Sequence, residues 1–275
     1  MSWRRRRGQD VKGRPVDTAP QLCATRPTSG NRASAHLSKG LRASILVTAL
    51  ILATSGGIMA RMHLSCADSY KDLAHETRSS PGHASPGWQG LTSVNPDIAG
   101  WIFVDELSMS LPVVRPHDDR DANWYLTHDF WGRRSLMGCP YIDDRCTADS
   151  EQIMVYGHNT ADPSAMFGPL RQLLDPSIFS ACGNAFWITP DEGPIRARPL
   201  FVIEVHAEYQ AIQHFDFEDR ASFSKMLETV SKESAAQAPD IAHHLKNVNR
   251  VLSLVTCSSP SPSERMRTIA VFDIS

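Results

Sequence analysis

From Leu91 to the C-terminus, short apolar runs alternate with segments rich in Gly, Pro, Asp and Ser. Each run has the length of a strand and is rich in Val, Ile and aromatic residues, a composition that favours β-strands. Seven or eight such runs within about 185 residues predict a closed or nearly closed, mostly β barrel with peripheral helices. The runs are GWIFV (100–104), LPVVRP (111–116), PYID (140–143), QIMVYGH (152–158), AFWITP (185–190), RPLFVIEVHAEY (198–209), RVLSLVTC (250–257) and RTIAVFDI (267–274).

Two segments of this region have helical rather than strand periodicity. In residues 218–234, apolar side chains recur at the spacing of one helix face, and Asp216 or Asp219 could cap the first turn. A shorter helix is expected at 164–174, with a break near Gly168 and Pro169, because proline interrupts a helix.

A different pattern precedes the barrel region. Residues 43–60, ASILVTALILATSGGIMA, contain no charged residue. This stretch is slightly shorter than the roughly 20 residues that cross a bilayer, and Arg42 and Arg61 could extend it by reaching the interface. We expect an uncleaved transmembrane anchor at 43–62. A cleaved signal peptide and a buried helix of a soluble protein remain alternatives.

Charge is distributed unevenly along the chain. Residues 1–42 hold ten Arg and Lys residues but only Asp10 and Asp17 as acids. Their composition predicts a disordered tail, and basic residues before an anchor predict a cytoplasmic N-terminus and an extracellular C-terminal domain. Residues 63–90 are then an extracellular stalk, and 91–275 a catalytic domain. A basic nucleic-acid-binding arm is the alternative, but the net charge of −2 provides no overall attraction to nucleic acid.

The six cysteines form no CxxC pair, so a zinc site of the usual spacing is not expected. Cys139 and Cys146 could form a disulfide if the domain lies outside the cell. The distance between their Cα atoms would decide this, and the sequence does not provide it.

Three positions carry candidate chemistry. His158 follows one apolar strand, Cys257 ends another, and Arg265 and Arg267 begin the last. Each residue alone is explained by a structural or solvated role. Together they fit nucleophilic catalysis, because a reactive thiolate needs a neighbouring imidazole. A guanidinium stays charged at any working pH, so it can stabilise an oxyanion but cannot act as the base.

These residues resemble the sortases, the cysteine transpeptidases of Gram-positive cell surfaces. Residues 253–257, SLVTC, are similar to the family motif TLxTC, with Ser253 in place of the first Thr. Arg267 follows Cys257 by ten residues and Arg265 by eight. The resemblance covers about residues 95–275. Segments similar to class B sortases are NPDIAGWIFVDELSMSLPVVRP (95–116), WYLTHDFWGRRSLMGCPYID (124–143), IMVYGHNTADPSAMFGPLRQL (153–173) and the helix at 218–234.

The resemblance implies a closed eight-stranded β-barrel and a membrane-anchored transpeptidase with an extracellular catalytic domain. It implies Cys257 as nucleophile, His158 as general acid and base, and Arg267 as oxyanion stabiliser. Substrate-binding roles are expected for Asn159, Thr256 and Arg265, whereas His128 is expected to be structural. Ser259 departs from the acidic residue that some class B members have two places after the cysteine.

The implied partners are secreted proteins with a C-terminal sorting motif, an amine of a cell-wall precursor or pilin as acceptor, and membrane lipid around the anchor. No nucleic acid, metal or organic cofactor is expected. Two alternatives stay open: a thiol peptidase that uses water instead of an amine, and a membrane-tethered binding module with an unreactive Cys257.

Overall fold

The computed structural model describes residues 39–78, 87–117, 119–147, 150–160, 162–183, 185–259 and 265–275. Most of the tail expected at 1–42 and part of the stalk expected at 63–90 lie outside these residues. The chain divides into two units, residues 1–50 and 51–275. The second unit contains the sheet and the core.

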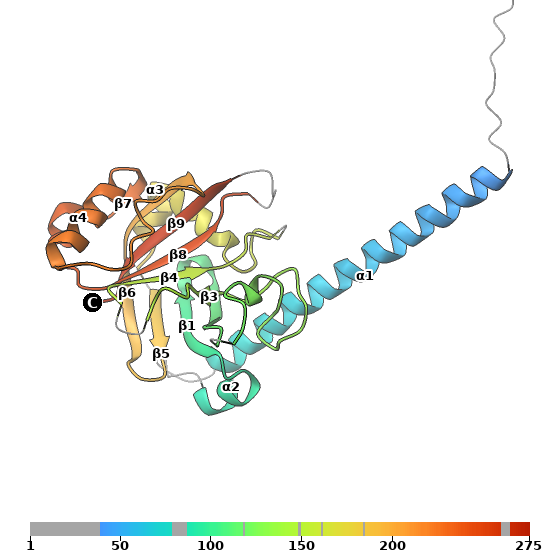
Figure 1. The fold of residues 1–275 in the computed structure, drawn as a ribbon, viewed down its shortest axis with the longest axis horizontal. Helices are drawn as coiled ribbons and strands as arrows, with labels where there is room; N and C mark the ends of the chain where they lie inside the picture. The colour runs from blue at the N-terminus through green and yellow to red at the C-terminus, as the bar shows by residue number, and fades with distance from the viewer. Residues whose placement is uncertain are drawn as a thin grey trace, which may run out of the picture. The chain divides into compact units, whose positions relative to one another are not determined.

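One sheet of nine strands organises the second unit (Figure 1). Its order is β5-β1-β2-β3-β4-β8-β9-β6-β7, and β5 also pairs with β6. This extra pairing closes a ring of eight strands, with β7 added outside β6, so the predicted eight-stranded barrel is confirmed. The strands are β1 (Ile98–Val104), β2 (Met109–Val114), β3 (Tyr141–Ile142), β4 (Gln152–Tyr156), β5 (Ala185–Thr189), β6 (Gly193–His206), β7 (Ser234–Gln237), β8 (Val251–Cys257) and β9 (Met266–Asp273).

Burial of branched and aromatic side chains explains why these runs form strands. All residues of β2 are buried, as are the first six of β8. Strands buried on both faces read as continuous apolar runs rather than as alternating patterns. The largest fully buried side chains include Trp187, Tyr125, Phe130, Phe167, Phe201, Phe223 and Phe272.

The short helices surround the barrel. They are α2 (Trp88–Val94), η1 (Asp105–Leu107), η2 (Trp124–Leu126), η3 (Gly168–Leu174), α3 (Pro176–Ala181), α4 (Arg220–Ser231) and α5 (Ile241–Asn247). The helix expected at 218–234 is α4, and of its two candidate caps Asp219 is the one used. The helix expected at 164–174 is the 3-10 helix η3. It begins at Gly168, and proline occupies its first turn, where a missing N–H costs nothing.

Helix α1 (Lys39–Arg78) carries the apolar stretch at its start. Within the described residues, one helical segment, Ala43–Glu76, includes a stretch long and apolar enough to cross a membrane. Apolar side chains such as Leu52 and Leu64 are exposed, whereas Cys66, Ala67 and Tyr70 are buried. The last turns of α1 therefore pack against the barrel of the same unit.

Candidate active site

Strand pairing brings His158 and Cys257 to the same rim of the barrel. Strands β4 and β8 run parallel, with Tyr156 beside Val255, so their C-terminal ends meet at one edge. The ladder continues one residue further, because the Gly157 amide donates to the Val255 carbonyl at 3.0 Å. His158 follows at once, and Cys257 is the last residue of β8. Figure 1 shows the two strands side by side.

Arg267 reaches this rim from the other side of Cys257. In the antiparallel pair β8–β9, Cys257 lies directly opposite Arg267. Directly opposed residues project to the same face, with Cβ atoms about 5 Å apart. Both side chains are half-buried, and Arg267 donates from Nη1 to the Met266 carbonyl at 3.1 Å. The side chains of Cys257 and Arg267 thus project to one face of the sheet.

Asn159 connects the histidine loop to the cysteine strand. Its side-chain Nδ2 donates to the backbone carbonyl of Cys257 at 2.9 Å, and Asn159 is buried. This bond fixes the end of β8 relative to the loop that begins at His158. The geometry shows Asn159 as a structural link, and its role in substrate binding stays a prediction.

The imidazole of His158 is held by a backbone group. Its Nε2 lies 2.8 Å from the carbonyl oxygen of Leu126, at the end of η2. A carbonyl oxygen only accepts hydrogen bonds, so Nε2 carries a proton and Nδ1 is left as the nitrogen that can exchange one. Sequence reasoning did not identify this partner, because a backbone carbonyl has no residue-type signature.

A close packing contact requires glycine before His158. A Cβ at Gly157 would lie 2.5 Å from Cγ of Phe167, which is fully buried. The Phe167 amide also donates to the His158 carbonyl at 3.0 Å. This bond joins the two ends of the loop, and the fully buried Phe167 ring packs under Gly157.

Cys257 differs from the other cysteines in the described part of the chain. Cys66, Cys139, Cys146 and Cys182 are buried, whereas Cys257 is half-buried. Burial raises the pKa of Cys146 to about 11 and that of Cys182 to about 12. Cys139 and Cys146 are both free, so the disulfide that the sequence left open is not formed in this structure.

The remaining predicted residues lie at different depths. Arg265 is exposed, and its Nη2 lies 2.5 Å from Oε1 of Glu208. Thr256 is buried, and its Oγ1 has no hydrogen-bond partner among the residues that the structure describes. Substrate binding by Arg265 and Thr256 stays a prediction. The His128 ring stacks on Trp124 with centroids 3.6 Å apart, as suits a structural residue.

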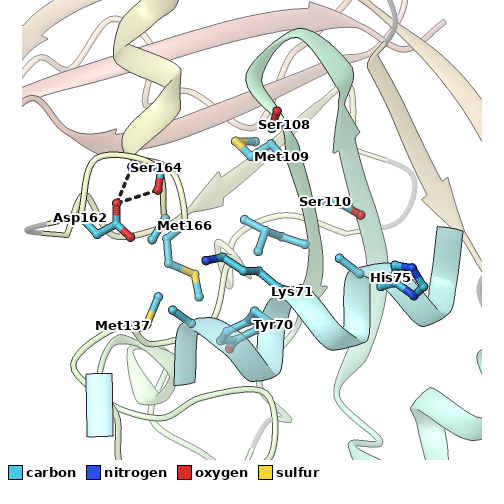
Figure 2. Close-up of a pocket in the computed structure, with 14 residues that line it drawn as sticks. Tyr70, Lys71, His75, Ser108, Met109, Ser110, Met137, Asp162, Ser164 and Met166 are labelled. Carbon is cyan, nitrogen blue, oxygen red and sulfur yellow. Dashed lines mark hydrogen bonds between the residues drawn. The ribbon is translucent and has the colours of Figure 1, made fainter. Parts of the chain in front are cut away.

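A pocket lies beside the loop that follows His158 (Figure 2). Its volume is about 260 Å³, and its walls come from α1, the start of β2, Met137 and the loop after His158. In that loop, the Asp162 carboxylate accepts hydrogen bonds from the amide and hydroxyl of Ser164. Within the described ranges, no group of three or more His, Cys, Asp or Glu side chains is arranged to hold a metal ion.

No family model matches the chain. Among curated proteins, it is similar to sortase B of Staphylococcus aureus (strain NCTC 8325 / PS 47), with 23% identity over 194 residues. The matched region covers 70% of this chain and 76% of that protein.

Solved sortase B structures share the fold. Clostridium perfringens sortase B has 23% identity and a TM-score of 0.59, and the match covers 68% of this chain and 98% of that chain. A Staphylococcus aureus sortase B–substrate complex has 21% identity and a TM-score of 0.64, with coverage of 76% and 95%. At this level of identity the structural similarity establishes a common fold, which agrees with the closed barrel described above.

Proposed function

We propose that this chain, which is similar to sortase B, is a cysteine transpeptidase whose active site is formed by Cys257, His158 and Arg267. The single observation that carries the assignment is the meeting of three strand ends. The parallel pair β4–β8 and the antiparallel pair β8–β9 bring the ends of β4, β8 and β9 to one rim.

In the first half-reaction, the Cys257 thiolate attacks the backbone carbonyl carbon of the substrate peptide. A carbon–sulfur bond forms, and the carbonyl oxygen takes the negative charge. The Arg267 guanidinium, opposite Cys257 in the ladder, stabilises that oxyanion. Collapse of the intermediate breaks the carbon–nitrogen bond, and the protonated His158 gives its proton to the departing amine. A thioester on Cys257 remains.

In the second half-reaction, an incoming amine replaces the sulfur. The nitrogen of the amine attacks the thioester carbonyl carbon while His158 accepts the proton that the amine loses. The carbon–sulfur bond then breaks and releases the Cys257 thiolate. Because Nε2 of His158 is committed to the Leu126 carbonyl, Nδ1 is the atom that carries the proton in both steps. The thioester conserves the energy of the cleaved peptide bond, so the sequence of steps needs no cofactor.

The substrate of this chain is a sorting motif near the C-terminus of a secreted protein, and the acceptor is an amine of a cell-wall precursor or of another surface protein. The likeness to sortase B, which has a known substrate complex, supports this class of substrate. The apolar start of α1 supports a membrane anchor, with the catalytic domain outside the cell.

The test uses the full chain in detergent, a peptide library and a primary amine such as glycine amide. We expect mass spectrometry of acid-quenched samples to find a peptide acyl group on Cys257, and the amine to appear in the product. Cys257→Ala is expected to abolish both signals. If the wild-type chain cleaves the peptide but the product never contains the added amine, the protein is a thiol hydrolase. If Cys257 stays unmodified with every peptide, the protein is a binding module.

A further inference from the structure

Tyr70 connects helix α1 to the segment that holds the catalytic histidine. Its side chain is 4% exposed. The hydroxyl donates to the Gly138 carbonyl at 2.9 Å and accepts from the Phe130 amide at 2.9 Å. Figure 2 shows Tyr70 projecting from α1 beside the pocket. One hydroxyl therefore binds two backbone groups of residues 130–138.

Gly138 in turn lies against the groups that orient His158. It has a φ of 61°, in the left-handed region that favours glycine. A Cβ at this position would lie 2.4 Å from the Tyr125 carbonyl oxygen, 3.1 Å from Cδ2 of His158 and 3.3 Å from the Leu126 carbonyl oxygen. Gly138 therefore packs so closely beside the imidazole and the Leu126 carbonyl that no side chain fits between them.

The same segment is fixed from the barrel side by a separate set of contacts. The Tyr125 hydroxyl donates to Asp97 Oδ2 at 2.7 Å, and the Cys139 amide donates to the Tyr125 carbonyl at 3.0 Å. Residues 125–139 are thus held between the barrel and α1. Cys66, one turn before Tyr70, adds a contact, because its Sγ lies 3.3 Å from Oγ of Ser135.

We propose that Tyr70 is a positioning residue of the active site, which acts through Gly138 on the Leu126 carbonyl and on His158. This role rests on the proposed transpeptidase function. The last turns of α1 would then support the active site as well as follow the apolar stretch. Small displacements of a catalytic group reduce turnover more than substrate affinity.

Tyr70→Phe in the full-length chain tests the proposal. The variant keeps the ring and removes the hydroxyl, with its hydrogen bonds to Gly138 and Phe130 and its contact with the Cys139 thiol. We expect kcat of amine transfer to fall about tenfold while KM changes less than about twofold, because binding groups are untouched. A second readout is the rate at which iodoacetamide alkylates Cys257. Tyr70→Phe is expected to slow alkylation when His158 is present and to have no effect in the His158→Ala background.

Gln152→Met is the matched control. Gln152 is fully buried and donates to the Ile212 and His214 carbonyls, at the opposite end of β4 from His158. Gln152→Met should lower the melting temperature by about as much as Tyr70→Phe does but leave kcat unchanged. Equal losses of kcat in the two variants, or equal slowing of alkylation with and without His158, would overturn the proposal. An inactive wild-type chain would instead refute the proposed function.

Discussion

At the scale of the residue, the alternation of side chains along β8 decides which residue lies opposite Arg267. Thr256 is buried, and Cys257, the next residue, is half-buried beside Arg267. A register slip of one residue would exchange their environments. The slip is opposed on both sides, because β8 pairs with β4 and with β9 over most of its length.

Alanine substitutions of the two arginines near Cys257 should differ in their effect on kcat. Arg267→Ala is expected to lower kcat of amine transfer by about 100-fold, because the oxyanion loses its charged donor. Arg265→Ala, the comparison variant, should leave kcat within about twofold, because its guanidinium is exposed and pairs with Glu208. The substrate-binding role predicted for Arg265 would change KM instead. Steady-state kinetics with one peptide and one amine measures both. A larger fall of kcat in Arg265→Ala than in Arg267→Ala would reverse the assignment.

At the scale of the element, a local hydrogen-bonded cap sets the start of helix α4. Helix α4 begins where Asp219 Oδ1 accepts from the Ser222 amide at 2.8 Å. Ser222 Oγ lies 3.2 Å from the Asp219 amide and completes a capping box. Phe223, Leu227 and Val230 of the same helix are buried. Packing of this apolar face therefore stabilises α4 in addition to the cap.

Asp219→Ala should lower the free energy of unfolding by about 1 kcal/mol, because the first-turn amide loses its acceptor. For a domain of this size, the melting temperature would fall by about 3 °C. Asp216→Ala is the control, since this aspartate precedes the helix and is not its cap. Differential scanning calorimetry measures the two variants. A larger effect of Asp216→Ala would show that the cap had been assigned to the wrong aspartate.

At the scale of the whole molecule, one chain combines an apolar helical stretch with the barrel rim that carries His158 and Cys257. Its cysteines can report on the proposed topology. Cys23 precedes the apolar stretch in the sequence, and Cys257 follows it. Burial raises the pKa of the Cys139, Cys146 and Cys182 thiols, so these groups react slowly at neutral pH.

In intact cells, a membrane-impermeant thiosulfonate should therefore label Cys257 and leave Cys23 unlabelled until the cells are lysed. Peptide mapping by mass spectrometry locates the label, and Cys257→Ala provides the control for its peptide. Labelling of Cys23 before lysis would contradict a cytoplasmic N-terminus. If neither Cys23 nor Cys257 is labelled before lysis but both are labelled afterwards, the domain that contains Cys257 lies inside the cell.

The sequence alone predicted most of the barrel, because β-branched and aromatic runs such as RTIAVFDI form strands wherever they can be buried. It did not predict β7, whose residues SAAQ lack such side chains and become a strand only by pairing with β6. It predicted the capped helix α4 but could not choose between Asp216 and Asp219, since both precede the apolar face.

For the candidate site, the spacing of Cys257 and Arg267 and the position of His158 after an apolar run were visible in the sequence, because these residue types carry the chemistry. Only the tertiary structure showed that β4 runs parallel to β8, which brings residues about 100 apart in the chain to one rim. The Leu126 carbonyl and the Tyr70 contact also required the fold. Every residue has a backbone carbonyl, so only position in space distinguishes the one that holds the imidazole of His158.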